Sequence, residues 1–441
     1  MKTVALHTLG CKLNFSETST IGNEFIENGF TIVDQKEKAD VYLFNTCTVT
    51  ENAERECRQL VRRALRINPE AFIIVTGCYA QLRPDEIASI VGVDAVLGSN
   101  EKFKLFSILY NFEKKELACI RVSPTEELID FGIAHSTDAD SRTRAFLKIQ
   151  DGCDYKCSFC TIPLARGASR SMPLVQIVEE FKSLVASGYK EIILTGVNVG
   201  DYGKNVGSNF YNLLSELVKV DEDFRIRISS IEPNLLSDEI LQLAAEEEKI
   251  CKHFHIPLQS GSPAILKAMQ RRYSIEDYKK LIYKIKESIP DCGIGVDVIV
   301  GFPGETEEEF IKTHNFLRDL PISYLHVFTF SERPDTIAIE MKGKVEITER
   351  KRRNKILRIL SEKKRNEFQS HLIGKELEVL FEEAEYKGMM KGFSSNYSLV
   401  QVPFKEEYIN EFCMVSIKRQ ANETCFGEVL DIKNSVDLIR T

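Results

Sequence analysis

Three cysteines stand close together near the middle of the chain, in the segment Cys153-Asp-Tyr-Lys-Cys157-Ser-Phe-Cys160. The segment follows an apolar run at residues 145–150 and an Asp-Gly pair, so we expect a loop that leaves a β-strand. Zinc and iron–sulfur centres usually take four protein ligands, but the next cysteine or histidine is Cys251. Three ligands favour a four-iron cluster with one iron open to a small molecule. A zinc site with a distant fourth ligand and three unrelated cysteines are the alternatives.

A second set of cysteines is predicted from the pattern of residues 1–120. Strand-like runs alternate there with helical patterns, at 3–9, 41–45, 72–76 and 95–98 for strands and 17–28, 51–67 and 84–90 for helices. Such alternation is typical of a parallel sheet covered by helices. Cys11, Cys47 and Cys78 each follow one of the first three strands, at the sheet edge where ligands bind. We therefore expect a second three-cysteine cluster there, with buried structural cysteines as the alternative.

Composition limits the class of protein. A length of 441 residues suggests about three domains at ~150 residues each, and 43% hydrophobic with 28% charged residues is typical of globular proteins. No signal peptide or membrane span is evident, so we expect a cytoplasmic protein whose twelve cysteines bind metal rather than form disulfides. The net charge of −8 does not indicate a nucleic-acid binder, yet residues 342–365 carry eleven Lys/Arg against three Glu.

The remaining chain divides into a predicted linker at 121–142, a strand–helix region at 143–345, a basic helix at 346–370 and a terminal module at 371–441. Six strands at 145–150, 191–197, 225–230, 253–258, 295–300 and 324–330 predict a partial (β/α)6 barrel. Five short strands after residue 371 predict a small OB-like barrel, a fold that often binds RNA. That module holds twelve acidic and eight basic residues, so it is no basic surface.

Most strands of the predicted half-barrel end in polar or glycine-rich segments. In barrel enzymes the active site lies at these carboxyl ends of the strands. The candidate ligand-binding residues there are Thr195, Gly196, Asn198, Glu232, His255, Gln259, Ser260, Asp297 and Gly301. Glu232 offers a carboxylate to an ammonium or a ribose hydroxyl, and Gln259 and Ser260 offer polar groups to a ribose. A lone histidine such as His255 is more often a hydrogen-bonded core residue than a ligand.

Basic side chains near these strand ends are candidates for binding phosphate or carboxylate groups. Arg166 and Arg170 follow the cysteine loop and Arg333 follows the sixth strand, with ordinary salt bridges as the alternative. Two further groups are candidate RNA contacts or simply solvated surface, namely Arg55, Arg58, Arg62 and Arg66 and, in the terminal module, Lys387, Lys391, Lys418 and Arg419.

The spacing C-x3-C-x2-C, with Phe159 before the last cysteine, resembles the signature of radical S-adenosylmethionine (SAM) enzymes. Together with Leu-Gly-Cys11, Asn-Thr-Cys47, Thr-Gly-Cys78 and the Gly-Phe-Pro-Gly-Glu segment at 301–305, it resembles the methylthiotransferase family over essentially the whole chain. This resemblance implies an N-terminal domain with three cysteines, a radical SAM core and a C-terminal TRAM domain. A cobalamin-binding N-terminal domain is disfavoured, because Ala5 stands at the aspartate position of the motif D-x-H-x-x-G.

The family resemblance also implies two four-iron clusters and SAM as cofactors. The cluster at Cys153, Cys157 and Cys160 would cleave SAM to a 5′-deoxyadenosyl radical, and the auxiliary cluster at Cys11, Cys47 and Cys78 would carry the sulfur to be inserted. An electron donor of the flavodoxin or ferredoxin kind and a tRNA anticodon stem-loop are the implied partners of a monomeric enzyme.

The segments at 229–233 and 196–203 resemble the subgroup that adds a methylthio group to C2 of N6-threonylcarbamoyladenosine at position 37 of tRNA. An arginine among Arg166, Arg170 and Arg333 would then suit the threonyl carboxylate. Phe330 departs from the tyrosine that is frequent in the family. The alternatives are isopentenyladenosine of tRNA or a ribosomal-protein aspartate as the substrate, a radical SAM enzyme with another outcome such as methylation, and a non-catalytic zinc-stabilised RNA-binding protein.

Overall fold

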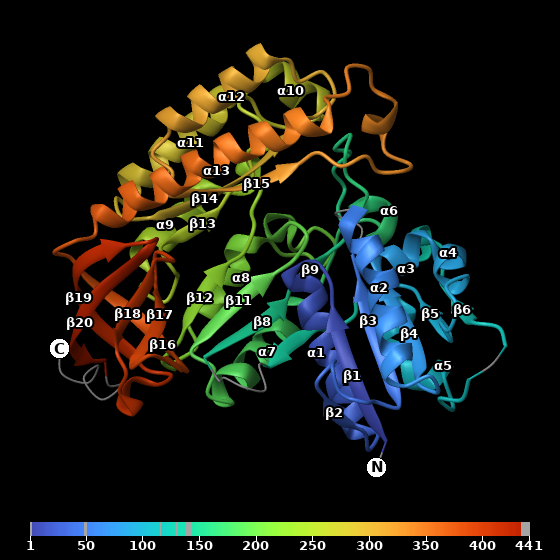
Figure 1. Cartoon of the computed structure of the whole chain (residues 1–441). Helices are drawn as coiled ribbons and strands as arrows, with labels where there is room; N and C mark the ends of the chain where they lie inside the picture. Colours follow the sequence, from blue (N-terminus) through green and yellow to red (C-terminus); the bar gives the residue numbers. More distant parts are fainter. Residues whose placement is uncertain (1, 48–50, 115, 129–130, 138–142, 434–441) are drawn as a thin grey trace.

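A computed structural model describes residues 2–47, 51–114, 116–128, 131–137 and 143–433. It confirms the predicted α/β fold class. The chain forms a parallel sheet at its N-terminal end, a half-barrel in the middle and a closed β-barrel at its C-terminal end (Figure 1). Residues 434–441 of the predicted terminal module lie outside the described residues.

The N-terminal sheet has the strand order β2-β1-β3-β4-β5-β6, and every pairing in it is parallel. Its strands are β1 (Thr3–Thr8), β2 (Thr31–Val33), β3 (Val41–Thr46), β4 (Phe72–Gly77), β5 (Ala95–Leu97) and β6 (Cys119–Arg121). Its helices are α1 (Lys12–Glu27), α2 (Glu51–Ile67), α3 (Cys78–Leu82), α4 (Pro84–Ala88) and α5 (Leu105–Ile108). The strands β3 and β4 are buried along their whole length, as expected for the centre of a parallel sheet.

The half-barrel contains the six predicted parallel strands, which are β8 (Arg144–Lys148), β11 (Glu191–Thr195), β12 (Arg225–Ile228), β13 (His253–His255), β14 (Gly293–Val300) and β15 (Tyr324–Thr329). Bridges such as Ser230 to His255 continue the order from β12 to β13. A seventh strand, β7 (His135–Thr137), pairs antiparallel with β8 and lies in the segment interpreted as a linker. The short strands β9 (Gln150–Asp151) and β10 (Arg170–Ser171) form a separate ribbon.

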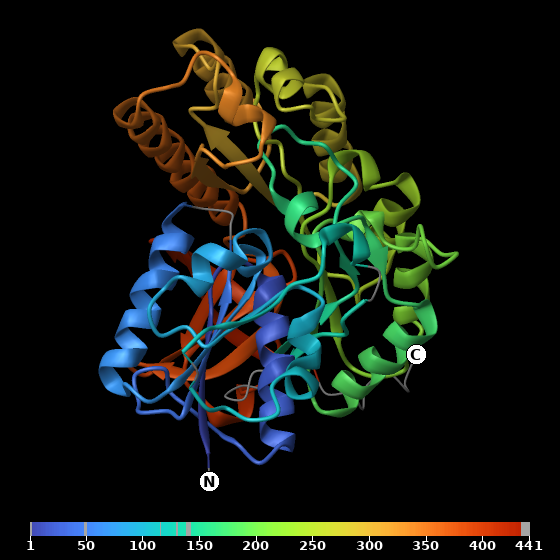
Figure 2. The same ribbon diagram turned by 90° about the vertical axis from the view of Figure 1, so that its right-hand side faces the viewer.

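Helices cover the outer face of the half-barrel and bury its largest hydrophobic core (Figures 1 and 2). They are α7 (Leu174–Ala186), α8 (Phe210–Leu217), α9 (Asp238–Glu246), α10 (Pro263–Ala268), α11 (Ile275–Ser288) and α12 (Glu307–Asp319), with the short α6 (Ile162–Arg166) after the cysteine loop. The sequence Thr306-x-x-Glu309 at the start of α12 forms only half of a capping box. Thr306 accepts a hydrogen bond from the Glu309 amide at 3.3 Å, but the Glu309 carboxylate binds Ser262 and Lys312 instead.

The long helix α13 (Ile347–Ser370) packs against β15 and leads to the terminal barrel. Leu357 and Leu360 of this helix are buried in the core, whereas Ile359 is 44% exposed. Several of the basic residues are also buried: Arg350 pairs with Glu332, and Arg353 pairs with Glu305 at 2.6 Å. The basic run is therefore partly internal structure rather than a free cationic surface.

The C-terminal barrel is closed and has the five predicted strands, in the order β16-β17-β18-β20-β19. Its strands are β16 (Glu376–Tyr386), β17 (Met389–Ser394), β18 (Leu399–Pro403), β19 (Phe412–Ala421) and β20 (Thr424–Ile432). It contacts the half-barrel through Arg225 and Arg227, which donate to the backbone carbonyls of Phe393 and Ser394 at the end of β17. Glu191 of the half-barrel binds Arg225 at 2.6 Å and Arg227 at 2.8 Å and so holds both arginines in place.

Candidate active site

A cavity of about 490 Å³ lies between the N-terminal sheet, the half-barrel and the β17–β18 turn. Cys11, Cys47 and Cys78 all line it, together with strand-end residues of the half-barrel. These cysteines follow three separate strands and lie at one wall, as expected for the shared carboxyl edge of a parallel sheet. The predicted residues Thr195, Gly196, Glu232, His255, Gln259, Asp297 and Arg166 line the same cavity.

The loops that carry these cysteines are fixed by backbone geometry and by asparagine. Gly10 has a φ of +100°, and a Cβ on it would lie 2.7 Å from Cys47 Sγ, so only glycine lets the two loops approach. The buried Asn14 side chain donates to the carbonyls of Leu9 and Thr46, both at 2.9 Å. These bonds tie the end of β1 to the end of β3. The cysteine wall is therefore built in advance by the fold.

The second cysteine loop, residues 153–160, lies beside this cavity. Cys160 lines a smaller space of about 380 Å³ with Phe159 and Arg333, and Gln259 and Asp297 line both spaces. The loop is anchored by Ser158, whose hydroxyl donates to the Ala268 carbonyl at 2.8 Å. The three N-terminal cysteines and Cys160 thus line adjoining spaces at the carboxyl ends of the strands, whereas Cys153 and Cys157 line neither space.

The cysteines of this loop sit in surroundings that disfavour bare thiolates. Burial raises the pKa of Cys153 to about 11 and that of Cys160 to about 12, and the neighbouring Cys157 raises both pKa values further. Three converging sulfurs of this kind are stable as thiolates only when a cation shares their charge. The donor set therefore fits a soft metal centre.

An arginine contacts one sulfur of this loop. Arg271 donates from Nη1 to Cys157 Sγ at 3.0 Å and also pairs with Glu232. Burial raises the pKa of the Cys157 thiol, and the positive charge of Arg271 opposes that effect. Arg271 connects a predicted cofactor-binding carboxylate to the proposed cluster.

The N-terminal cysteines have an equivalent contact. Arg166 donates from Nε to Cys78 Sγ at 3.3 Å, and its two terminal nitrogens bind Glu17 and Asp151 at 2.9–3.1 Å. Lys102 binds Glu17 at 2.6 Å and Lys148 binds Asp151 at 2.7 Å, all within the protein interior. Burial lowers the pKa of Lys102 to about 8, against the attraction of Glu17.

The charge of this buried network favours an anion at the cysteines. Two carboxylates, Glu17 and Asp151, face four cations, because Arg170 also binds Asp151 at 3.2 Å. The excess of two positive charges lies next to Cys78. It complements the negative charge of a thiolate-bound cluster. Arg166 itself is 1% exposed and its polar atoms are engaged here, so the contacts favour a structural role over contact with RNA.

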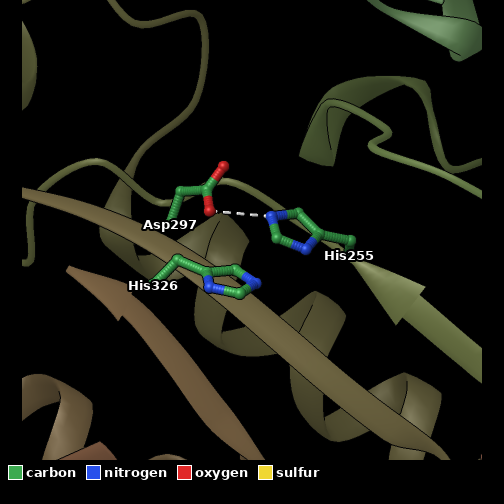
Figure 3. Close-up of side chains that lie close together, drawn as sticks. All are labelled: His255, Asp297 and His326. Atoms are coloured by element: carbon green, nitrogen blue, oxygen red, sulfur yellow. Dashed lines mark ion pairs between the residues drawn. The ribbon is translucent and has the colours of Figure 1, made fainter. Parts of the chain in front are cut away.

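The side chains of His255, Asp297 and His326 lie close together (Figure 3) and line the larger cavity, and Asp297 also lines the smaller space. His255 from β13 binds Asp297 from β14 at 2.8 Å, and the ring of His326 from β15 lies 5.2 Å from that of His255. Burial lowers the pKa of His326, and the nearby His255 lowers it further. The pairing with Asp297 fixes the His255 ring toward the cavity.

Some predicted residues lie away from both spaces. Ser260 is buried and its hydroxyl lies 3.1 Å from that of Thr313, and Gly301 packs against Arg350. Neither they nor Arg170 line either space. Asn198 also lies outside the walls, yet it is 3% exposed and neither side-chain polar atom has a partner among the described residues. A buried amide of this kind fits a polar ligand next to it.

Sequence profiles of known families match two parts of the chain. The radical SAM superfamily matches residues 147–317, and uncharacterized protein family UPF0004 matches residues 3–98. The chain is 40% identical over 440 residues to threonylcarbamoyladenosine tRNA methylthiotransferase MtaB of Bacillus subtilis, covering 98% of both. It is 43% identical over 380 residues to the Aquifex aeolicus protein of the same name, covering 86% of this chain and 92% of that one. This chain belongs to the family of radical SAM tRNA methylthiotransferases.

The fold of this methylthiotransferase also resembles solved radical SAM structures. The methyltransferase TsrM from Kitasatospora setae, solved with cobalamin and a [4Fe-4S] cluster, aligns with a TM-score of 0.56 at 16% identity, covering 89% of this chain and 81% of that chain. At this identity the likeness concerns the fold alone. It agrees with the arrangement of an N-terminal α/β domain before the half-barrel. No described helix is long and apolar enough to span a membrane.

Several residues of the site were not predicted from the sequence of this methylthiotransferase. They are Lys12, Arg227, Arg271, Tyr324, His326 and Tyr397. Lys12 follows a predicted ligand directly, which was an available signal. Tyr397 comes from the C-terminal barrel, where a φ of +67° turns the backbone, and its ring lies 4.8 Å from the Arg227 guanidinium. No local pattern connects these two residues, because they are 170 positions apart.

Proposed function

We propose that this methylthiotransferase adds a methylthio group to C2 of N6-threonylcarbamoyladenosine at position 37 of tRNA. Cys11, Cys47 and Cys78 hold an auxiliary four-iron cluster in this proposal, and Cys153, Cys157 and Cys160 hold the cluster that binds SAM. When bound, the auxiliary cluster supplies the sulfur, and the other cluster supplies the electron that cleaves SAM to a 5′-deoxyadenosyl radical.

One observation carries the proposal: Cys11, Cys47 and Cys78 line one space, Cys160 of the second cysteine loop lines the adjoining space, and Ile162, Gln259 and Asp297 line both. Insertion of sulfur into a C–H bond requires a sulfur carrier and a radical source on either side of one substrate. A zinc-stabilised binding protein needs no such convergence. A radical SAM enzyme that only methylates needs no second set of cysteines. The relatives named MtaB support the choice of base.

The walls of the cavity suggest how the chain holds SAM. Thr195 and Gly196 bring backbone close to the lumen, and Gln259, with a φ of +70°, presents its amide to both spaces. The His255–Asp297 pair and Glu232 add polar groups that suit an ammonium or a ribose. These groups exclude bulk water from one side of the cavity and orient a ligand toward the 153–160 loop.

The route for RNA runs over exposed basic residues outside the cavity. Arg358 and Arg365 of α13 flank a hollow that also contains His326 and so adjoins the cavity mouth. Arg333 is only 5% exposed and lines the smaller space, whereas Arg55, Arg58, Arg62 and Arg66 are all exposed on α2. The C-terminal barrel adds exposed Lys387, Lys391, Lys418 and Arg419. In this proposal they contact the phosphates of an anticodon stem-loop in the cytoplasm, and a flavodoxin or ferredoxin supplies electrons to the monomer.

Mass spectrometry of tRNA nucleosides tests the proposal. The reconstituted enzyme, with SAM and a reductant, is given two matched tRNAs that carry either N6-threonylcarbamoyladenosine or isopentenyladenosine. The expected product is the 2-methylthio derivative of the first nucleoside alone. Product from the second alone would reassign the enzyme to the activity named for its 33%-identical relative from Endomicrobium trichonymphae, tRNA-2-methylthio-N(6)-dimethylallyladenosine synthase. No product from either would reject tRNA methylthiolation.

A further inference from the structure

Lys12 is a cation of the cavity wall, and no carboxylate of the described residues lies within 4 Å of its ammonium. It is the first residue of α1, directly after Cys11, and it is exposed to the cavity that holds the three N-terminal cysteines. Among the described residues, no hydrogen bond or carboxylate within 4 Å engages its ammonium. Burial lowers the pKa of Lys12, the positive charge of Arg227 lowers it further, and the more distant carboxylate of Glu191 raises it.

The two arginines of this wall each have a carboxylate partner. Arg166 binds Glu17 and Asp151, and Arg227 binds Glu191. His255 binds Asp297. The carboxylates of the cavity are engaged in the same way, because Glu232 pairs with Arg271. Among the described residues, Lys12 is therefore the one lysine or arginine of the cavity wall with no carboxylate within 4 Å.

The lumen around Lys12 also has the shape and surfaces that a modified base requires. Tyr324 and Tyr397 line the cavity with aromatic rings, and Val197, Ile228 and Pro257 line it with apolar side chains. A planar base packs against such surfaces, while a carboxylate extending from it needs a cation at the wall. An ammonium on a flexible four-carbon stem can meet that carboxylate as a point charge.

We propose that Lys12 binds the carboxylate of the amino-acid group attached to the substrate base, and that it selects the threonylcarbamoylated base over neutral ones. This inference rests on the proposed function and identifies the side chain that would recognise the substrate. It replaces Arg166 and Arg170 as the residue for the threonyl carboxylate, since both are buried in the ionic network. Lys12 is a binding residue and transfers no group in the reaction.

Binding of matched anticodon stem-loops tests this role. Three RNAs of one sequence carry N6-threonylcarbamoyladenosine, its methyl ester or unmodified adenosine, and their affinities are measured by fluorescence anisotropy with the reconstituted enzyme at fixed salt. The wild type should bind the acid about tenfold more tightly than the ester, since a charge-assisted bond contributes that much. Lys12→Met should reduce this ratio to about one and Lys12→Arg should keep most of it. Lys280→Met, an exposed lysine on the outer helix α11, is the matched control and should behave as wild type.

Several outcomes would overturn the role of Lys12. An unchanged acid-to-ester ratio in Lys12→Met rejects it, and equal weakening of all three RNAs would make Lys12 a phosphate contact. Loss of iron would show that Lys12 serves the auxiliary cluster, and weaker SAM binding would show that it reads the carboxylate of SAM. If the wild type converts the threonylcarbamoylated tRNA while Lys12→Met keeps its selectivity, only this inference fails. If the wild type converts no such tRNA, the proposed function fails instead.

Discussion

The Arg166 guanidinium, in the radical SAM core, donates a hydrogen bond to the Cys78 sulfur, in the N-terminal domain, across 3.3 Å. Arg166 and its partner Glu17 are both buried, so the contact joins the two domains at the wall of the cavity. Arg166→Met leaves the Glu17 carboxylate with fewer partners and should lower the free energy of unfolding by about 3–5 kcal/mol, the usual cost of breaking a buried pair. Denaturant titration measures it. Arg358→Met, exposed on α13, should change it by less than about 0.5 kcal/mol, and an equal loss in both variants would contradict this role.

Arg271 should tune the cluster that binds SAM. Its hydrogen bond to Cys157 stabilises charge on that sulfur, and such bonds raise the reduction potential of iron–sulfur clusters. Arg271→Met should therefore shift the midpoint potential to more negative values, on the order of tens of millivolts. Redox titration followed by electron paramagnetic resonance measures the shift. Arg272→Met is the matched control, because Arg272 lies 3.9 Å from the Tyr155 ring and donates to the Asp154 carbonyl. Equal potentials in wild type and Arg271→Met would reject this tuning.

Alanine substitutions at two glycines with positive φ distinguish the effect of backbone strain from that of a steric clash at the auxiliary site. Gly10 and Gly29 have φ values of +100° and +81°, but only a Cβ at Gly10 would clash, at 2.7 Å from Cys47 Sγ. Each alanine substitution should cost about 1–2 kcal/mol of backbone strain. Gly10→Ala should in addition lose about half of the bound iron, while Gly29→Ala keeps it. Iron assay of the two reconstituted proteins decides the matter, and full iron in Gly10→Ala would show that the loops can separate.

Glu24 of α1 should make stability depend on pH near neutrality. Burial and then the neighbouring Glu27 raise the pKa of Glu24 to about 7, from an ordinary value of 4.5. The folded chain therefore holds an extra proton between pH 4.5 and 7, and stability falls as pH rises through this window. Glu24→Gln should be more stable than wild type by about 1 kcal/mol at pH 8, allowing for solvent screening, and little different at pH 4.5. A stability difference that does not change with pH would refute the shifted pKa.

Periodic patterns were enough to predict the elements that frame the site. Helix α2 has the predicted bounds, because its apolar residues recur at helical spacing over seventeen positions. The meeting of Cys11, Cys47 and Cys78 followed from one rule, that parallel strands share a carboxyl edge. Strand β7 was missed, because its three residues, His135–Thr137, carry no apolar alternation.

Long-range contacts account for what the sequence did not reveal. Arg166 was interpreted as a ligand for phosphate or carboxylate, but its partner Glu17 is 149 positions away and no local pattern connects them. Ser260 was expected to face a ribose, and Thr313 of α12 engages its hydroxyl instead. Lys12 directly follows the predicted ligand Cys11. That it has no carboxylate partner among the described residues could be recognised only from the ion pairs of the folded chain.

The iron and sulfide content of the variant Cys11→Ala, Cys47→Ala, Cys78→Ala tests most directly whether two clusters face one cavity. The wild type reconstituted under anaerobic conditions should hold about eight irons and the variant about four, since each cluster contributes four. The variant should still cleave SAM to 5′-deoxyadenosine and should form no methylthiolated tRNA. Equal iron in both proteins, or zinc in place of iron and sulfide, would contradict the account.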